Sequence, residues 1–558
     1  MNIINKFFAV ARLYWLGEEK KGAFSLLALL GVLLIAYTQL SVLLNRNQGE
    51  LISTLAAKDE DLFRGAVISF LLVLVVYVPL FAGFSFVQSK LGLFWRRWLT
   101  NHFLTKYFAN RSFYQLAIKE KEIDNPDQRI SEDIRSFTQE SLTFFLVIIQ
   151  SILQVIAFST VLWSISQQLV IFLIVYALLG TLITTGVFGK KLINLNFTQL
   201  QTEANFRFGL VRVRENSESI AFYQGENQEK NHLSKLFNDL YQNFNSLIVW
   251  QELYLGLFVN TFEFLPYVIP AIVVAPSVLS GELEVGKVSE ATGAFARVFF
   301  SLNIIVSRFQ SLTSFAAGIN RLWSFYNFLD DSQQPSFQQR KIDTIIEPKL
   351  TVQQLTLETP NYQNTLFNNL SFELPSGEGL LVMGSSGCGK SSLLRTIAGL
   401  WDSGTGAIFR PQLSEMLFLP QRPYMIIGTL REQLIYPSLE KTVSEEKLQA
   451  VLTLVNLGDL AQRFGGFEVE KDWAEMLSLG EQQRIAFARI FINEPEYVIL
   501  DEATSALDTT NEANLYQHLQ EKNITYISVG HRESLRQYHQ LMLKFNDDQS
   551  WQINPLIK

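Results

Sequence analysis

Six stretches of about 20 mostly apolar residues constrain this 558-residue chain more than any other feature, because a helix of that length crosses a bilayer. The stretches are 24–44, 66–86, 143–164, 167–188, 253–279 and 293–316. Hydrophobic residues make up 48% of the chain and charged residues only 18%, which is typical of an integral membrane protein with a polar domain attached. We therefore expect an α-helical transmembrane domain of six spans over residues 24–327.

Cationic residues are concentrated in two long polar segments between these stretches, 87–142 and 189–252. The positive-inside rule places both segments, and the N-terminus, in the cytoplasm. Residues 1–23 interleave apolar and cationic side chains, so we expect an amphipathic elbow helix on the inner membrane face. After an even number of spans, the rest of the chain is cytoplasmic too.

Residues 328–347 are polar and bounded by prolines, which indicates a linker. From residue 348 to 558 short apolar strands alternate with helical patterns, which indicates an α/β nucleotide-binding domain. No basic tail or Lys/Arg-rich block suggests nucleic acid as a partner.

The α/β domain opens with an apolar strand, a glycine-rich turn and a helical pattern, which is the context of a phosphate-binding P-loop. Backbone N–H groups of such a turn converge on phosphate oxygens, Lys390 adds a positive charge and the Ser391 hydroxyl reaches Mg²⁺. The single cysteine fills space there and has no redox role. The predicted ATP-binding residues of the turn are Gly384, Ser385, Ser386, Gly387, Cys388, Gly389, Lys390, Ser391 and Ser392.

Two later strands end in polar residues that complete this chemistry. Residues 497–500 run into Asp501 and Glu502. Asp501 fits an Mg²⁺-holding role, and Glu502 fits a general base for the attacking water, with a helix N-cap as the alternative. The strand 524–529 is followed by His531, at the strand end where open α/β sheets bind ligands.

The order of the P-loop, Gln421, the segment Leu477–Arg484, the Asp-Glu pair, the segment Ser505–Asp508 and His531 resembles an ABC-transporter ATPase. The resemblance implies that two such domains face each other and enclose ATP. Gln421 would then sense Mg²⁺ and water, and His531 would contact the γ-phosphate. The remaining residues that it places at the nucleotide are Ser478, Gly480, Glu481 and Asp508.

Three positions depart from the usual ABC pattern. Leu479 stands where the signature has glycine, and Glu481 stands where it has glutamine. The adenine-stacking tyrosine has no clear counterpart, and Tyr362 is a weak substitute for it.

The motifs Asn125–Arg129, Glu203–Tyr223 and Asp472-Trp473 resemble the peroxisomal fatty-acyl-CoA (subfamily D) transporters and their bacterial SbmA/BacA/YddA-like relatives. One P-loop on a chain with its own membrane segment makes a half-transporter, so a C2 homodimer is the simplest assembly. The cytoplasmic loops are expected to dock near Gln421 and couple the domains. For single charged residues in these loops, a solvated surface is a better interpretation than a role in coupling.

Polar residues recur within the apolar stretches. A polar side chain in lipid is unfavourable in free energy unless it faces a cavity or another helix. One face of the last span would carry the polar residues Asn303, Ser307, Gln310 and Ser314. Hydrogen bonding between helices is as good an interpretation of this face as a water-filled cavity. Glu263 is the strongest candidate for a functional residue within the spans, and either Arg297 or Arg308 could be its ion-pair partner. These stripes favour a wet cavity for hydrophilic or amphipathic cargo.

The sequence therefore predicts an ATP-driven transporter of exporter-type architecture, with ATP and Mg²⁺ as cofactors. We expect a homodimer in the bacterial inner membrane that moves a peptide or a cobalamin-like compound and has its ATPase domain in the cytoplasm. The alternatives are a fatty-acid or acyl-CoA transporter, an ATP-gated channel or regulator, and a soluble ABC protein, which the six apolar spans disfavour.

Overall fold

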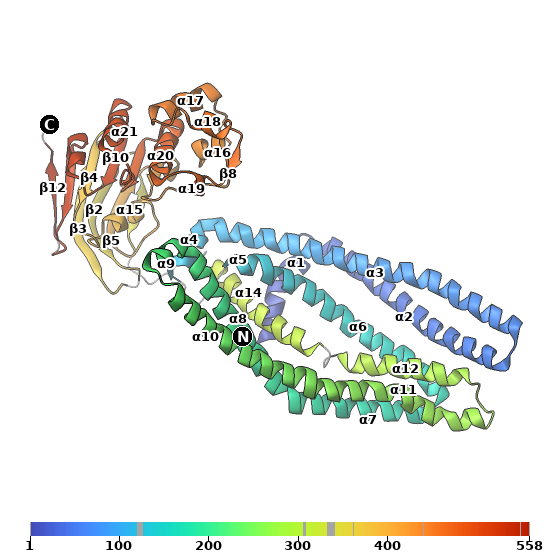
Figure 1. The fold of residues 1–558 in the computed structure, drawn as a ribbon. Coiled ribbons are helices and arrows are strands. Elements are labelled where there is room, and N and C mark those ends of the chain that lie inside the picture. Colours follow the sequence, from blue (N-terminus) through green and yellow to red (C-terminus); the bar gives the residue numbers. More distant parts are fainter. Residues whose placement is uncertain are drawn as a thin grey trace. The chain divides into compact units, whose positions relative to one another are not determined.

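The chain divides into two compact units, a helical unit (Met1–Gln334) and an α/β unit (Pro335–Lys558), each described by itself (Figure 1). The structure is a computed structural model that describes residues 2–119, 126–304, 308–331, 341–360, 362–438, 440–546 and 548–556. The division falls within the segment 328–347 that was predicted to be a linker. Of that segment, residues 332–340 lie outside the described part.

Long helices build the helical unit (Figure 1). They are α1 (Ile3–Trp15), α2 (Lys20–Ala57), α3 (Glu60–Phe108), α6 (Ile134–Ile165), α7 (Gln167–Ile183), α8 (Lys190–Glu215), α10 (Glu226–Ile248), α11 (Gly256–Leu279), α12 (Gly286–Leu302) and α14 (Phe309–Asp331). Shorter turns connect them: η1 (Ala109–Arg111), α4 (Ser112–Lys119), α5 (Pro126–Gln128), η2 (Arg129–Asp133), η3 (Thr184–Gly189), α9 (Ser217–Tyr223) and η4 (Val249–Leu255).

Five continuous helical segments of the described chain are long and apolar enough to cross a membrane. Helices suit this environment because they satisfy their own backbone hydrogen bonds in lipid. Each of the first five predicted spans lies inside one such segment. The segments are Lys20–Ala57, Glu60–Leu116, Pro126–Ile165, Gln167–Glu215 and Glu226–Leu279.

The sixth predicted span, 293–316, is not one continuous helix in the described chain. α12 ends at Leu302 with Asn303 as its C-cap, and α14 begins at Phe309. Ser307 of the predicted polar face lies outside the described residues, as do the side chains of Gln310 and Ser314. Hydropathy averages over such an interruption and therefore does not reveal it.

The two predicted cytoplasmic loops are mainly helical. α3 continues past residue 86 to Phe108, and the motif at 125–129 becomes α5 and the start of η2, apart from Asn125, which lies outside the described residues. Between 189 and 252, α8 and α10 lie against each other and α9 forms the connection. The π-helical turns η3 and η4 join these helices to α7 and α11.

Close contacts hold α2 against α12 in the helical unit. Gly286 faces the backbone of Gly49, where any Cβ would clash. Asn45 donates its side-chain amide to the carbonyl of Glu290 at 3.0 Å. Small residues and interhelical hydrogen bonds of this kind drive helix packing where both helices lie in lipid.

An ion pair with a buried carboxylate ties α14 to the N-cap of α6. Arg321 donates from Nε and Nη2 to both carboxylate oxygens of Asp133, at 2.9 and 2.6 Å. The Asp133 side chain is 5% exposed and that of Arg321 48%. Lys106 of α3 adds a second link, to Asp330 at 2.5 Å. The last helix of the unit is therefore anchored to two others.

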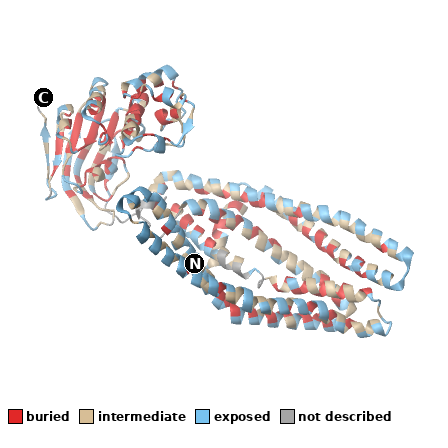
Figure 2. Cartoon of the chain, in the orientation of Figure 1, coloured by how far each residue is buried: buried red, intermediate tan, exposed pale blue. Residues whose placement is uncertain are grey.

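The larger sheet of the α/β unit has six strands in the order β12-β11-β4-β10-β9-β6, and only β12 at its edge is antiparallel. These strands are β4 (Gly379–Met383), β6 (Met416–Leu419), β9 (Tyr497–Asp501), β10 (Thr525–Val529), β11 (Leu541–Phe545) and β12 (Trp551–Pro555). Parallel strands covered on both faces are rich in apolar residues, as Leu380, Leu381 and Val382 of β4 illustrate, and all five residues of β10 are buried. In Figure 2 the central strands of this sheet are largely coloured as buried.

A smaller sheet and several helices complete the α/β unit. The strands β1 (Asp343–Ile346), β5 (Gly404–Arg410), β2 (Leu350–Glu358) and β3 (Thr365–Leu374) form a four-stranded sheet in that order. β7 (Gly428–Thr429) pairs with β8 (Glu470–Lys471). The helical elements are α15 (Lys390–Ile397), η5 (Leu413–Glu415), α16 (Leu430–Ile435), α17 (Glu445–Leu454), α18 (Leu460–Phe464), α19 (Trp473–Met476), α20 (Leu479–Asn493), α21 (Thr509–Glu521) and η6 (Glu533–Tyr538).

We predict that Arg321→Gln lowers the free energy of unfolding by about 2 kcal/mol, because it leaves the Asp133 carboxylate buried without its ion-pair partner. Chemical denaturation in detergent micelles measures this. Adding Asp133→Asn to Arg321→Gln should recover much of the loss, since no buried charge remains. Arg46→Gln, which breaks an exposed pair with Glu50, should change stability by less than about 0.5 kcal/mol. Equal losses in the single and double variants would contradict the prediction.

Candidate nucleotide-binding site

Four neighbouring parallel strands of the larger sheet bring the predicted site residues to one edge. Leu380, Ile527, Ile499 and Phe418 lie side by side across β4, β10, β9 and β6, so these strands run in register. Their carboxyl ends lead into the glycine-rich turn, His531, the Asp-Glu pair and Gln421 respectively. Ligands of open parallel sheets bind at this edge.

The turn after β4 adopts a backbone that only glycine tolerates well. Gly387 and Gly389 have φ angles of +86° and +102°, in the left-handed region. Gly389 is also the N-cap of α15, and a Cβ there would lie 3.2 Å from the Phe367 ring. The Lys390 side chain folds back over the turn and donates from Nζ to the carbonyls of Gly384 at 2.8 Å and Ser385 at 2.7 Å.

The other residues of the turn are accessible to a ligand. Ser385 and Ser386 are exposed, and Ser391, Ser392 and Cys388 are half-buried. The turn therefore places backbone N–H groups and one ammonium group around an open position, an arrangement that could hold phosphates.

A hydroxyl and a carboxylate from two elements meet beside this turn. Ser391 Oγ donates to Asp501 Oδ1 at 3.0 Å. Burial raises the pKa of Asp501, which the Ser391 hydrogen bond only partly offsets. These are the hard oxygen ligands that Mg²⁺ prefers, so the residues fit the ion. Among the described residues no group of three or more His, Cys, Asp or Glu could hold a metal by itself, so the remaining ligands would come from phosphate and water.

Glu502 lies between two of the predicted catalytic residues. Gln421 Nε2 donates to Glu502 Oε2 at 2.9 Å, and His531 Nε2 lies 3.2 Å from Glu502 Oε1. Glu502 has a left-handed φ of +49°, and its backbone N–H donates to the Val529 carbonyl at 3.1 Å. It does not cap the following helix, since Asp508 is the N-cap of α21. The arrangement offers a carboxylate that accepts a hydrogen bond from Gln421 and lies beside the His531 ring.

The signature segment begins α20 with a capping box. Ser478 Oγ accepts from the Glu481 N–H at 3.3 Å, and Glu481 Oε2 accepts from the Ser478 N–H at 2.9 Å. Arg463 Nη2 donates to Glu481 Oε1 at 2.6 Å. Burial alone would raise the pKa of Glu481, but the hydrogen bonds from Arg463 and Ser478 lower it overall. The acid in place of the usual glutamine therefore closes the helix cap and pairs with Arg463.

The remaining predicted residues lie in the same unit. Asp508 accepts a hydrogen bond from the Asn511 N–H at 2.8 Å as the cap of α21. Gly480 packs near the Ala506 carbonyl, 3.1 Å from where a Cβ would stand. Tyr362 is half-buried in the turn after β2 with a φ of +56°, and its N–H donates to the Thr359 carbonyl at 2.7 Å.

Gln483 joins the separate parts of the site, and sequence reasoning missed it. Its side chain is fully buried, and Nε2 donates to the Gln421 carbonyl at 2.9 Å and to Ser505 Oγ at 3.2 Å. Its Oε1 accepts from the Ala506 N–H at 3.0 Å. The sequence offered one indication of this role, because Gln483 is a polar residue on an otherwise apolar face of α20.

Arg532 is a second missed residue, directly after His531. Its guanidinium donates to the Leu507 carbonyl at 2.9 Å and the Ser505 carbonyl at 3.0 Å. It therefore fixes the segment after Glu502 to the strand end that carries His531.

Comparison with known proteins decides the family. The ABC transporter transmembrane region 2 family matches residues 12–279, and the ABC transporter ATPase family matches residues 367–505. An uncharacterized ABC transporter ATP-binding protein of Synechocystis is 46% identical over 540 residues, covering 95% of this chain and 81% of that protein. The chain belongs to the ABC transporter family. ATP binding and ATPase activity coupled to transport follow from this membership.

Two further relatives place this ABC transporter within the family. The chloroplastic ABC transporter D family member 2 of Arabidopsis thaliana is 36% identical, covering 98% of this chain and 88% of that protein. The human lysosomal cobalamin transporter ABCD4 is 30% identical, covering 89% and 88%. With the bacterial relatives, which include YddA of Escherichia coli, they confirm the resemblance to subfamily D and its bacterial counterparts.

A solved structure confirms the fold class of this ABC transporter. A bacterial Atm1-family ABC exporter with ATP bound superposes with a TM-score of 0.73 at 18% identity, covering 93% of each chain. The helical transmembrane domain and the α/β P-loop ATPase domain are thus those of an ABC exporter, and the chain is an integral membrane protein.

We predict that Gln483→Leu lowers kcat for ATP hydrolysis by at least tenfold, because the Gln421 carbonyl and the Ala506 N–H lose their buried partner. Steady-state ATPase assays of purified protein measure this. Gln482→Leu is the matched control, since among the described residues Gln482 donates to the carbonyls of Ala474 and Leu477, which lie outside this bridge, and it should have a much smaller effect. Similar kcat values for the two variants would refute the bridging role.

Proposed function

We propose that two copies of this chain form a homodimeric transporter in which ATP hydrolysis moves a hydrophilic or amphipathic cargo across the membrane. The observation that carries this proposal is the carboxylate of Glu502, held between Gln421 and His531 beside the Ser391–Asp501 pair. A carboxylate in this position suits a general base at the attacking water.

The residues of the glycine-rich turn and of the strand ends have different roles in ATP hydrolysis. Lys390 and the backbone N–H groups of 384–391 hold the β- and γ-phosphates. Ser391, Asp501 and Gln421 would hold Mg²⁺, which supplies charge neutralisation at those phosphates. Glu502 takes a proton from water as the water oxygen attacks the γ-phosphorus, the bond to the bridging oxygen breaks, and ADP leaves. His531 donates a hydrogen bond to the γ-phosphate.

A second copy completes each site in this proposal. Ser478 is exposed at the N-terminus of the 15-residue helix α20, where unsatisfied N–H groups favour an anion. Gly480 is half-buried in the first turn of that helix. The γ-phosphate held by one copy would therefore meet Ser478 and Gly480 of the other copy.

Exposed apolar residues in each unit support the proposal that hydrolysis is coupled to the membrane helices. Phe222 and Tyr223 on α9 are 79% and 87% exposed, and Ile427 in the segment after Gln421 is 97% exposed. Arg489 donates to the Tyr424 carbonyl at 2.8 Å and so fixes this segment to α20. Burying these residues against each other would link Gln421 to the cytoplasmic helices.

Polar groups in the membrane helices support a cargo that is not purely apolar. Ser301 donates to Gln154 Oε1 at 2.9 Å, and Ser41 Oγ and Asn303 Oδ1 are buried without a partner among the described residues. No ion pair joins Glu263 to Arg297 or Arg308 within the described chain. The name of the human relative favours a cobalamin-like compound over a peptide, and we place the protein in a bacterial inner membrane with its α/β unit in the cytoplasm.

We predict that Glu502→Gln lowers ATP hydrolysis at least 100-fold while ATP still binds, because the general base is lost and the phosphate-binding groups remain. Lys390→Ala should instead weaken ATP binding. Glu494→Gln, on the surface, is the control and should hydrolyse ATP at the normal rate. Phosphate release and fluorescent-nucleotide binding measure the two steps. Wild-type hydrolysis by Glu502→Gln would refute the assignment.

The cargo test uses full-length protein in sealed vesicles with ATP. We expect uptake of cobalamin to exceed that of a cationic peptide or an acyl-CoA, and to vanish in the Glu502→Gln variant. Preferential uptake of acyl-CoA would establish the alternative cargo. Cobalamin flux that persists in Glu502→Gln with ATP bound would indicate an ATP-gated channel instead.

A further inference from the structure

A cavity of about 390 Å³ lies where α1 packs against α2, α3 and α6 of the helical unit. Its wall is almost entirely apolar and mainly aromatic: Phe8 and Trp15 come from α1, Phe24 and Leu27 from α2, Trp95 from α3 and Phe145 from α6. The volume is within the range of pockets that hold a small ligand. The hydroxyl of Ser141, which also lines it, already donates to the Phe137 carbonyl.

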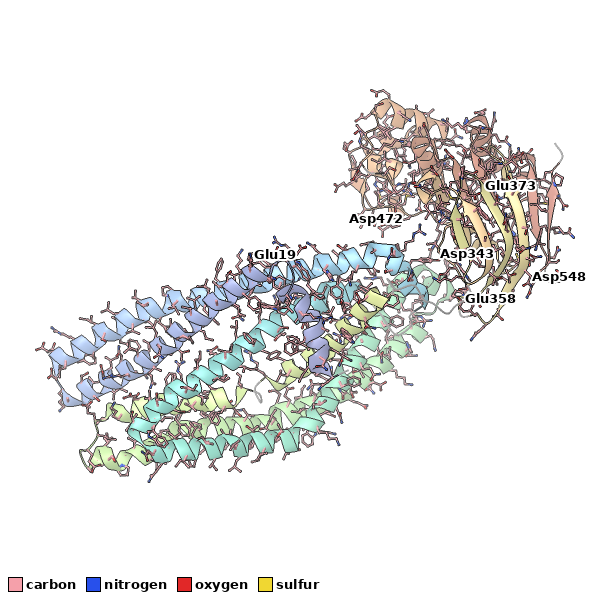
Figure 3. All side chains as sticks on the ribbon, turned by 180° about the vertical axis from the view of Figure 1, so that it is seen from behind. Glu19, Asp343, Glu358, Glu373, Asp472 and Asp548 are labelled. Atoms are coloured by element: carbon pink, nitrogen blue, oxygen red, sulfur yellow. The ribbon has the colours of Figure 1, made fainter. Side chains whose placement is uncertain are left out.

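One cation stands in this apolar wall. Arg12 of α1 lines the cavity, its side chain is exposed, and it forms no ion pair within the described residues. Glu18 and Glu19 lie in the turn between α1 and α2, where Figure 3 labels Glu19, and neither pairs with Arg12 in the part of the chain that the structure describes. The cavity therefore combines an apolar wall with one positive charge, that of Arg12, which has no ion-pair partner within the described residues.

The exposed face of α1 indicates what surrounds the cavity. Ile4, Phe8 and Leu16 are 57%, 62% and 69% exposed, which is expensive in water and favourable in lipid. The opposite face of α1 is buried, with Tyr14 stacked on Trp95 at 5.8 Å between ring centroids. The helix is thus fixed to the unit on one side and faces the bilayer on the other, with the cavity beside it.

We propose that this cavity binds an anionic phospholipid of the surrounding bilayer, with an acyl chain among the aromatic residues and the head-group phosphate on Arg12. A planar guanidinium donates two parallel hydrogen bonds to a phosphate, which a zwitterionic lipid's neighbouring cation would weaken. The acyl chain of the lipid would cover the side chains of Phe8, Phe24 and Phe145, which are otherwise exposed. The site is separate from the nucleotide site and does not depend on which cargo is carried.

The test uses the full-length protein in nanodiscs of phosphatidylcholine that contain a small fraction of phosphatidylglycerol with a photoactivatable acyl chain. Mass spectrometry then maps the cross-linked peptides. Leu27→Trp fills the half-buried wall of the cavity, and Leu29→Trp is its control, because Leu29 is exposed on the same helix and does not line the cavity. Arg12→Gln removes the charge, and Lys21→Gln is its control. Wild-type ATPase activity shows that each variant is folded.

We expect label in the peptides of α1 and α6, reduced at least fivefold by Leu27→Trp and by Arg12→Gln and unchanged by the two controls. Label that is insensitive to Leu27→Trp, or equal labelling by a phosphatidylcholine probe with the same chain, would overturn the proposal. Displacement of the label by free oleate at equal concentration would show that a fatty acid, not a phospholipid, is the occupant, and would also overturn it.

Discussion

The parallel register of β4, β10, β9 and β6 is the constraint on which the rest of the ATPase depends. Because the strands run in the same direction and in register, the residues that follow them meet at one edge although they are far apart in the chain. The Ser391–Asp501 hydrogen bond joins the first element to the third, and Glu502 then contacts the residues that follow the other two. Moving any one strand by a residue would reverse its side chains and separate these groups.

The same edge connects to the rest of the α/β unit through side-chain hydrogen bonds. Gln483 and Arg532 both hydrogen-bond to the segment 505–507, and Gln483 also bonds to the Gln421 carbonyl. Arg489 continues this network to the segment that presents Ile427. Burial lowers the pKa of Arg489 to about 10, so it is still charged at neutral pH and donates to carbonyls of that segment and α16. A movement at the nucleotide would therefore be transmitted through rigid contacts.

Local patterns in the sequence were sufficient for much of the fold and for the glycine-rich turn. Gly389 and Lys390 are recognisable because the turn needs left-handed backbone and a nearby cation within eight residues. Gln483 was not recognisable, since its function depends on a carbonyl 62 residues away that tertiary structure brings close. The interruption at Asn303 was missed because hydropathy averages over it, and the pairing of Glu481 with Arg463 was missed because tertiary structure brings together residues 18 apart in the chain.

The account depends most on the claim that each ATP is held between two copies of the chain, by Lys390 of one and Ser478 of the other. Purified heterodimers test this directly. If one copy carries Lys390→Ala and the other Ser478→Arg, one composite site stays intact, and we predict about half of the wild-type ATPase activity. If a single copy carries both substitutions beside a wild-type copy, both sites are damaged and activity should be lost. The reverse pattern, with activity only in the second heterodimer, would show that each chain binds and hydrolyses ATP alone and would contradict the account.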